Sequence, residues 1–151
     1  MKIKSFHGSD RLIEEALKIR FKVFVLEQQV PEELEKDDID AQATHVLLLE
    51  NGFGFATGRI FADNENANIC RLGRVAVLKE FRGNGWGRTI CKILIKLAEE
   101  QGFEKILIHA QTKVESFYGK LGFSRFGNEF FEAGIEHIEM EKILLRREAN
   151  R

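Results

Sequence analysis

Apolar and polar residues alternate along this chain in two different periods, which separate the expected helices from the expected strands. Apolar residues recur at helical spacing over residues 13–24 and 90–98, so we expect two amphipathic helices there. A shorter helix is expected over 114–121, closed by Gly122. Alternating or continuous apolar runs predict strands over residues 1–6, 45–50, 54–62, 68–77, 106–110, 123–131 and 135–144.

The predicted order of elements is β-α-β-β-β-α-β-α-β-β, which indicates an α+β domain with a mixed central sheet flanked by helices. Asn51-Gly52 is a strong signal for a tight hairpin turn, and Ala133-Gly134 joins the last expected pair of strands. With 151 residues, the chain is expected to form a single domain over 1–145, followed by a polar tail over 146–151.

The segment that follows the first expected helix is strongly acidic. Between residues 27 and 40 it holds seven carboxylates against one lysine: Glu27, Glu32, Glu33, Glu35, Asp37, Asp38 and Asp40 against Lys36. We expect a long loop whose carboxylates form a solvated face. If the loop lines a cleft instead, its charge favours a cationic substrate.

Composition and charge exclude several classes of protein. The net charge of −1 and the pI of about 6.4 give no case for binding nucleic acid or a membrane surface. No apolar run reaches the length of a membrane span, and the first ten residues lack the apolar centre of a signal peptide. Cys70 and Cys91 have no C-x-x-C spacing, which argues against a metal site and indicates reduced thiols in a cytoplasmic protein.

The segment with the clearest chemistry is a strand, a glycine-rich turn and a helix between Leu72 and Gln101. Glycines in the turn allow positive φ angles and close approach of a ligand. Free backbone N–H groups at the helix start form an anion site suited to phosphate. The flanking arginines strengthen this interpretation over that of a turn that merely starts a helix. The turn reads Arg82-Gly83-Asn84-Gly85-Trp86-Gly87-Arg88.

Two common phosphate-binding motifs do not fit this turn. No lysine follows the glycines, as the P-loop of a nucleoside triphosphatase requires. The spacing is G-x-G-x-G rather than G-x-G-x-x-G, and hairpin strands precede it, so a dinucleotide-binding fold is also disfavoured.

The pattern R-x-x-G-x-G after a strand resembles the pyrophosphate loop of the GNAT N-acetyltransferase superfamily. A second element, QTKVESFYGKLGF over residues 111–123, is similar to that superfamily's later signature N-x-x-A-x-x-(F/L)-Y-x-x-x-G-F. Gln111 replaces the usual asparagine and Val114 the usual alanine. IRFKVFVLEQQVPEELEKDD and EAGIEHIEM further resemble a group of small bacterial GNAT proteins, YjcF-like or ElaA-like.

The resemblance implies a GNAT-like fold that binds acetyl-coenzyme A as co-substrate and needs no metal. It implies an N-acetyltransferase in which an amine attacks the thioester directly in a ternary complex. Two alternatives stay open: a non-catalytic module that binds coenzyme A, and an acyltransferase with a different acyl group or acceptor. Small GNAT proteins are often homodimers. The cofactor-binding residues carried over are Val75, Ala76, Val77, Arg82, Gly83, Asn84, Gly85, Trp86, Gly87, Arg88, Gln111, Phe117 and Tyr118.

Tyr118 lies in the matching motif and is the expected proton donor to the departing thiolate; the alternative is a tyrosine hydrogen-bonded in the core. The strand over 68–77 contains no carboxylate that could act as the general base. Candidate bases are Glu27, at the end of the first helix, and His137, on the last strand. His137 has an equally good interpretation as a strand histidine bonded to a backbone carbonyl, and His45, Glu132 and the acidic loop are weaker candidates.

Arg71 and Arg74 lie on the strand that leads into the glycine-rich turn. They would contact an acidic acceptor or pair with the acidic loop. The residues therefore leave the charge of the acceptor open.

Overall fold

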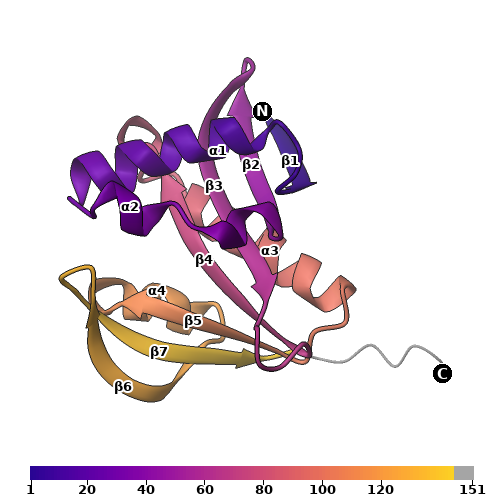
Figure 1. Cartoon of the computed structure of the whole chain (residues 1–151), viewed down its shortest axis with the longest axis vertical. Helices are drawn as coiled ribbons and strands as arrows, with labels where there is room; N and C mark the ends of the chain where they lie inside the picture. Colours follow the sequence, from indigo (N-terminus) through magenta and orange to yellow (C-terminus); the bar gives the residue numbers. More distant parts are fainter. Residues whose placement is uncertain (145–151) are drawn as a thin grey trace. The chain divides into compact units, whose positions relative to one another are not determined.

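The computed structural model describes residues 1–144 and confirms the α+β class. The tail predicted for 146–151 lies outside the described residues. The elements follow the predicted order, with short helical turns added (Figure 1). They are β1 (Lys2–His7), α1 (Ile13–Arg20), η1 (Phe21–Glu27), α2 (Glu32–Glu35), η2 (Asp38–Ala41), β2 (Thr44–Glu50), β3 (Phe53–Ala62), β4 (Ile69–Val77), η3 (Lys79–Phe81), α3 (Trp86–Glu100), β5 (Lys105–Gln111), η4 (Thr112–Val114), α4 (Glu115–Lys120), β6 (Ser124–Glu132) and β7 (Ile135–Ile143).

The chain divides into two compact units. The first comprises Met1–Phe61 and Gly73–Leu94, and the second comprises, among the described residues, Ala62–Leu72 and 95–144. β4 and α3 therefore each contribute residues to both units. The single domain expected over 1–145 stays a prediction.

The first unit contains an antiparallel sheet in the order β1-β2-β3, followed by the later residues of β4. Asn51 and Gly52 have φ angles of 52° and 77° at the turn between β2 and β3. Both central residues therefore adopt the positive φ that a tight hairpin requires, which confirms the predicted turn.

Helices cover the sheet of the first unit. The α1 helix lies across β2 and β3 in Figure 1, and the Ile19 side chain lies 3.4 Å from the position of a Cβ atom built on Gly54 of β3. A Cβ atom on Gly58 would approach Ile90 and Leu94 of α3 to 2.7 and 2.8 Å. Glycine at position 58 therefore permits the close packing of α3 on β3.

The first helix runs to Glu27, as predicted, but its last part has a different geometry. Its α-helical turns end at Arg20, and Phe21–Glu27 forms a π-helix. Such wide turns are rare and are found mostly at functional sites. The buried face of the helix includes Arg20 among Ala16, Ile19 and Val23, so a charged group occupies a position that the apolar pattern predicts to be hydrophobic.

The second unit contains the first residues of β4 and the strands β5, β7 and β6, in that order. Ile69–Arg71 pair in parallel with Lys105–Leu107, β5 pairs antiparallel with β7, and β7 pairs antiparallel with β6. Ala133 and Gly134 have φ angles of 52° and 77°, which confirms the predicted turn between the last two strands. Alternate apolar side chains of β5 and β7 are buried and form the core of this unit.

Candidate active site

The glycine loop, residues 82–88, lies at the surface of the first unit and leads from η3 into α3. Gly83 and Gly85 have φ angles of 87° and 80°, and a Cβ atom built on either residue would meet no atom within 4 Å. Gly87, by contrast, is already part of α3. The loop therefore presents exposed backbone to open space, and the first N–H groups of α3 lack carbonyl partners within the helix. This arrangement fits a phosphate group.

The guanidinium of Arg82 is held by other groups of the protein. Its Nη1 and Nη2 atoms donate to the two carboxylate oxygens of Glu27 at 2.8 and 2.6 Å, and its Nε donates to the carbonyl of Val77 at 2.9 Å. The Glu27 hydrogen bond raises the pKa of the guanidinium above its usual value. Glu27, at the end of η1, and Arg82, at the start of the glycine loop, are both predicted site residues, and the structure joins them in one bidentate ion pair.

An aromatic cluster packs next to the glycine loop. The ring of Phe55 is buried and stacks on Phe81 with a centroid distance of 4.4 Å. The indole of Trp86 meets the same Phe55 ring edge-on at 5.4 Å. Trp86 therefore packs its ring against β3, which anchors the start of α3.

Val75, Ala76 and Val77 end β4 in the first unit. Ala76 is buried, whereas Val75 and Val77 are half-buried. The carbonyl of Val77 already accepts a hydrogen bond from Arg82. Arg74 precedes them with a φ angle of 52°, which is unusual for a residue inside a strand.

Tyr118 lies on α4 in the second unit. Its ring is half-buried and is held edge-on between Phe117 at 5.0 Å and Phe123 at 5.8 Å. Phe117 thus supports Tyr118 directly. The proton donor and the hydrogen-bonded core tyrosine both stay predictions for this residue.

Three strands of the second unit bring a row of side chains together. In the register of the sheet, His137 of β7 lies opposite Gln111 of β5 on one side and opposite Phe130 of β6 on the other. Residues directly opposite each other share a face of the sheet. His137 stacks on Phe130 at 5.7 Å, so this row includes both a predicted cofactor residue and a predicted base.

The His137 ring has a defined tautomer. Its Nδ1 lies 2.7 Å from the carbonyl oxygen of Ile135. Because a carbonyl only accepts, Nδ1 carries the hydrogen and the Nε2 lone pair is the basic site of the ring. The backbone contact that was the competing interpretation is present, and it leaves Nε2 in the form that a base requires.

Sequence reasoning found no signal at His109, which the structure places among charged groups. Its Nδ1 lies 3.2 Å from Glu132 and its Nε2 lies 3.4 Å from Arg71 and 3.9 Å from Glu139. Arg71 in turn donates to Asp63 at 2.8 Å. We call the following set the histidine face of the second unit: His109, Gln111, Phe130, Glu132, His137 and Glu139.

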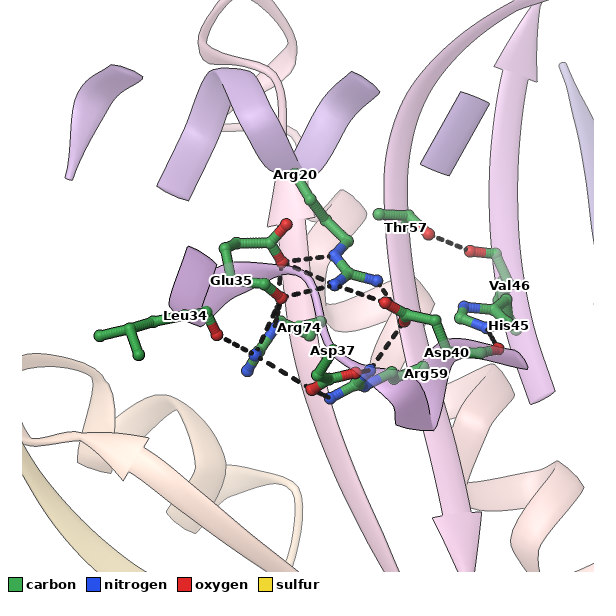
Figure 2. Close-up of polar contacts among 10 residues, drawn as sticks. All are labelled: Arg20, Leu34, Glu35, Asp37, Asp40, His45, Val46, Thr57, Arg59 and Arg74. Carbon is green, nitrogen blue, oxygen red and sulfur yellow. Dashed lines mark hydrogen bonds and ion pairs between the residues drawn. The ribbon is translucent and has the colours of Figure 1, made fainter. Parts of the chain in front are cut away.

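The acidic loop is the predicted solvated face only in part: Glu32, Glu33 and Asp38 are exposed, whereas three other carboxylates turn inward. Figure 2 shows three arginines from α1, β3 and β4 converging on three of its carboxylates. The Arg20 guanidinium lies 2.6 Å from both the Glu35 and the Asp40 carboxylates. We call this set the arginine network: Arg20, Arg59 and Arg74 with Glu35, Asp37 and Asp40.

The arginine network is balanced in charge and buried at four of its six members, whereas Arg74 and Asp37 are half-buried. Arg20 is 1% exposed and Arg59 is 3% exposed. Burial alone would raise the pKa of Asp40, but hydrogen bonds and charge from Arg20 and Arg59 hold that pKa below its usual value. The same balance, set mainly by Arg59, lowers the pKa of Asp37. These carboxylates are paired with arginines, and the charge of the acceptor stays open.

His45, a weaker candidate base, belongs to the same region. Its ring is 1% exposed and its Nε2 lies 2.9 Å from the Asp40 carbonyl oxygen. Burial lowers the pKa of His45. The ring also stacks on Phe6 at 5.4 Å, so the geometry favours a structural role in holding the loop.

Arg20 and Arg59 are the members of the network that sequence reasoning missed. Each carries a charge at a position that the apolar pattern marks as buried, and an acidic segment lies between them in the sequence. A buried arginine requires a partner, so this combination was an available signal.

A cavity of about 560 Å³ opens beside α1 and η1 in the first unit. Apolar side chains from three segments, including Phe21, Leu26, Phe53 and Leu78, form its wall. Positively charged lysines and negatively charged glutamates also line it. The Lys22 ammonium lies 5.9 Å from the centre of the Phe53 ring.

Cys70 and Cys91 are both buried and unbridged. Burial raises the pKa of the Cys70 thiol to about 12, which keeps it protonated near neutral pH. Within residues 1–144, no three histidine, cysteine or carboxylate side chains gather as metal ligands, and no helix has the length and apolar character needed to cross a membrane.

Comparisons with known proteins agree on one family. The family model described as an acetyltransferase (GNAT) domain matches residues 10–144. The chain is 36% identical over 137 residues to the uncharacterized protein YyaT of Bacillus subtilis, covering 89% of this chain and 90% of that protein. It is 33% identical over 135 residues to the uncharacterized N-acetyltransferase YjcF of the same organism, covering 89% and 94%. The crystal structure of Escherichia coli ElaA matches with a TM-score of 0.85 at 24% identity, covering 93% of this chain and 98% of that one.

Proposed function

Because the chain belongs to the GNAT acetyltransferase domain family, we propose that it transfers an acetyl group from acetyl-coenzyme A to a primary amine. The family carries acyl-coenzyme A-dependent N-acyltransferase activity, and the proposal specifies the acyl group and the acceptor. The observation that carries it is the glycine loop, whose exposed backbone and positive φ angles suit a pyrophosphate. We also propose that the protein is cytoplasmic, which its two unbridged thiols support.

In this proposal the glycine loop binds the pyrophosphate mainly through backbone N–H groups. Arg88 adds a second positive charge at the start of α3. Arg82 contributes less directly, since Glu27 and Val77 engage all three of its nitrogen atoms. The backbone at Val75 and Val77 serves the pantetheine arm.

The reaction requires a neutral amine, a donor to the thioester carbonyl oxygen and a proton for the leaving thiolate. A lysine-like amine of pKa about 10.4 is neutral in only roughly one molecule in a thousand near pH 7.5, a penalty of about 4 kcal/mol. The Nε2 atom of His137 takes the proton from the attacking amine. A backbone N–H of β4 donates to the thioester oxygen, and the Tyr118 hydroxyl protonates the sulfur as the C–S bond breaks.

Glu27 is the less suitable base of the two predicted candidates. Both of its carboxylate oxygens accept from Arg82, and the paired charges stabilise the deprotonated form without leaving a free basic oxygen. His137, in contrast, bonds through Nδ1 and retains its Nε2 lone pair.

Calorimetric titration with acetyl-coenzyme A and with coenzyme A tests whether the protein binds the cofactor, which every candidate function requires. We expect a dissociation constant well below the millimolar range, because the loop supplies several N–H donors and an arginine. Gly83→Val places a β-branched side chain where φ is 87° and is expected to abolish binding. Gly52→Val makes the equivalent change at a φ of 77° in the β2–β3 turn and is the matched control. Absence of any binding by the wild type contradicts the proposal.

A second candidate function is a non-catalytic module that holds coenzyme A. The absence of a carboxylate from β4, where some GNAT enzymes place the base, favours it. A thiol-release screen with polyamines, aminoglycosides, amino acids and peptides separates the two functions. Thiol release that depends on one class of amine supports the enzyme, whereas tight binding with no release for any amine supports the module.

A further inference from the structure

Arg74 lies inside a strand and has a positive φ angle, a combination that no other described non-glycine residue shows. Among residues 1–144, the non-glycine residues with positive φ are Gln29, Asn51, Arg74 and Ala133. Three of them lie outside regular strands, after η1 or in hairpin turns. Arg74 alone in this set lies inside a strand, β4, where the extended conformation is expected.

The side chain of Arg74 is tied to the acidic loop. Its Nε lies 3.1 Å from the Glu35 carboxylate and 3.2 Å from the Glu35 carbonyl oxygen. Its Nη2 donates to the carbonyls of Glu35 at 3.1 Å and Leu34 at 3.3 Å, and it reaches the Asp37 carboxylate at 3.4 Å. Figure 2 shows these contacts converging on the end of α2 and on Asp37, which lies between α2 and η2.

The acceptors of Arg74 are themselves held in place. Arg20 binds the Glu35 carboxylate at 2.6 Å, and Arg59 binds both carboxylate oxygens of Asp37 at 2.8 Å. Both of these arginines are buried. The loop therefore offers Arg74 a rigid set of acceptors rather than a flexible one.

The conformation of residue 74 has a consequence for the backbone that follows. In an extended strand, successive peptide groups point to opposite sides, whereas the two peptide groups that flank a residue in the left-handed region point to the same side. The direction of the Val75 N–H group thus depends on the φ and ψ angles of Arg74. A non-glycine residue adopts positive φ at a steric cost and needs surrounding contacts to hold it there.

We propose that Arg74 is a positioning residue for acyl transfer. Its side chain, anchored on Leu34, Glu35 and Asp37, holds residue 74 in the left-handed conformation. This conformation aims the Val75 N–H at the thioester carbonyl oxygen of the acyl donor. The inference rests on the proposed acyltransferase function and assigns the arginine network a role in it beyond stability.

The test compares Arg74→Ala with Arg74→Gly. Both variants lose the anchor, but only glycine adopts positive φ without a steric cost. We expect Arg74→Ala to lower kcat about tenfold, in line with a misaligned oxyanion donor, and to leave the KM for acyl-coenzyme A nearly unchanged. Arg74→Gly is expected to recover most of that kcat.

Asn51→Ala is the matched control. Asn51 has the same φ of 52° but lies in the β2–β3 turn, so alanine meets the same backbone penalty away from β4. We expect Asn51→Ala to lower the melting temperature and to leave kcat unchanged. A loss of kcat in Asn51→Ala equal to that in Arg74→Ala would assign the effect to general destabilisation and overturn the proposal.

Two other kinetic outcomes also overturn it. Equal loss of kcat in Arg74→Ala and Arg74→Gly shows that the side chain acts by itself, and wild-type kcat in both shows that it does not act. A crystal structure of Arg74→Ala gives a readout that does not depend on activity. A φ at residue 74 that stays positive contradicts the positioning role, even if the wild type proves to bind coenzyme A without transferring an acyl group.

Discussion

The arginine network of the first unit and the histidine face of the second unit hold similar kinds of ionisable side chains in opposite surroundings. In the network, Arg20 is 1% exposed and binds two carboxylates at 2.6 Å. On the histidine face, the side chains of His109 and Glu132 are 36% and 48% exposed and meet at 3.2 Å.

The difference separates structural charges from those available for chemistry. A buried charge with several partners changes its protonation state only at a large energetic cost, so it organises the loop around it. On the histidine face, His109 and Glu132 are open to solvent, whereas His137 is only 7% exposed and is hydrogen-bonded through Nδ1 to the Ile135 carbonyl. The first unit thus uses its charges to shape the backbone, and the second unit supplies the proposed proton-transfer groups, His137 and Tyr118.

Arg20→Ala breaks the structural side of this comparison and has the largest expected effect. It leaves Glu35 and Asp40 buried without their main partner, which costs about 3–5 kcal/mol of the free energy of unfolding. Urea denaturation followed by circular dichroism measures this loss. Arg125→Ala is the control: its ion pair with Glu115 is exposed, so we expect little change. Equal stability of the two variants contradicts a structural role for the network.

His137→Gln tests the chemical side. With the Nε2 base removed, we expect kcat to fall about a hundredfold and the melting temperature to change little. The decline of kcat/KM at acidic pH should also disappear, because no base remains to be protonated. His7→Gln, at an exposed histidine whose ring is hydrogen-bonded to Ser9, is the control. Normal turnover by His137→Gln would exclude it as the base and direct attention to the His109–Glu132 pair.

Tyr118→Phe removes one hydroxyl and keeps the ring that packs against Phe117 and Phe123. We expect kcat to fall at least about tenfold because the thiolate loses its proton donor. Coenzyme A affinity, measured by calorimetry, should stay within about twofold of the wild type, since the glycine loop supplies most of the binding. Unchanged turnover refutes the acid role, and a parallel loss of affinity would instead indicate a cofactor contact.

The pH dependence of stability is the smallest of the expected effects. The groups responsible for it lie in the first unit. The lowered pKa of His45 means that its stabilising contribution is complete above pH 6.5 and is lost as the pH falls through its folded pKa. The contributions of Asp37 and Asp40 are complete above pH 3.8 and are lost below it by the same argument. Urea midpoints measured from pH 8 to pH 3 should therefore decline in two steps. Persistence of the upper step in His45→Gln contradicts its assignment.

The order of the elements, the two hairpin turns and the glycine loop could all be predicted from the amino-acid sequence. These features depend on residues a few positions apart: apolar periodicity, and small or polar residues such as Asn51-Gly52 where φ is positive. Two motifs about 30 residues apart resembled those of the GNAT superfamily, and the comparisons confirm that family.

Which charged groups meet could not be predicted in this way, because their partners are far apart in the sequence. Arg20 and Asp40 are 20 residues apart, Arg74 and Glu35 are 39 apart, and Arg82 and Glu27 are 55 apart. Ion pairing depends on distance in space and on burial, which no local pattern encodes. The acidic loop therefore looked solvated, although Arg20 and Arg59, two of the three arginines that bind it, are buried. The left-handed conformation of Arg74 has the same origin, because contacts from a distant loop outweigh the preference of a strand residue for the extended form.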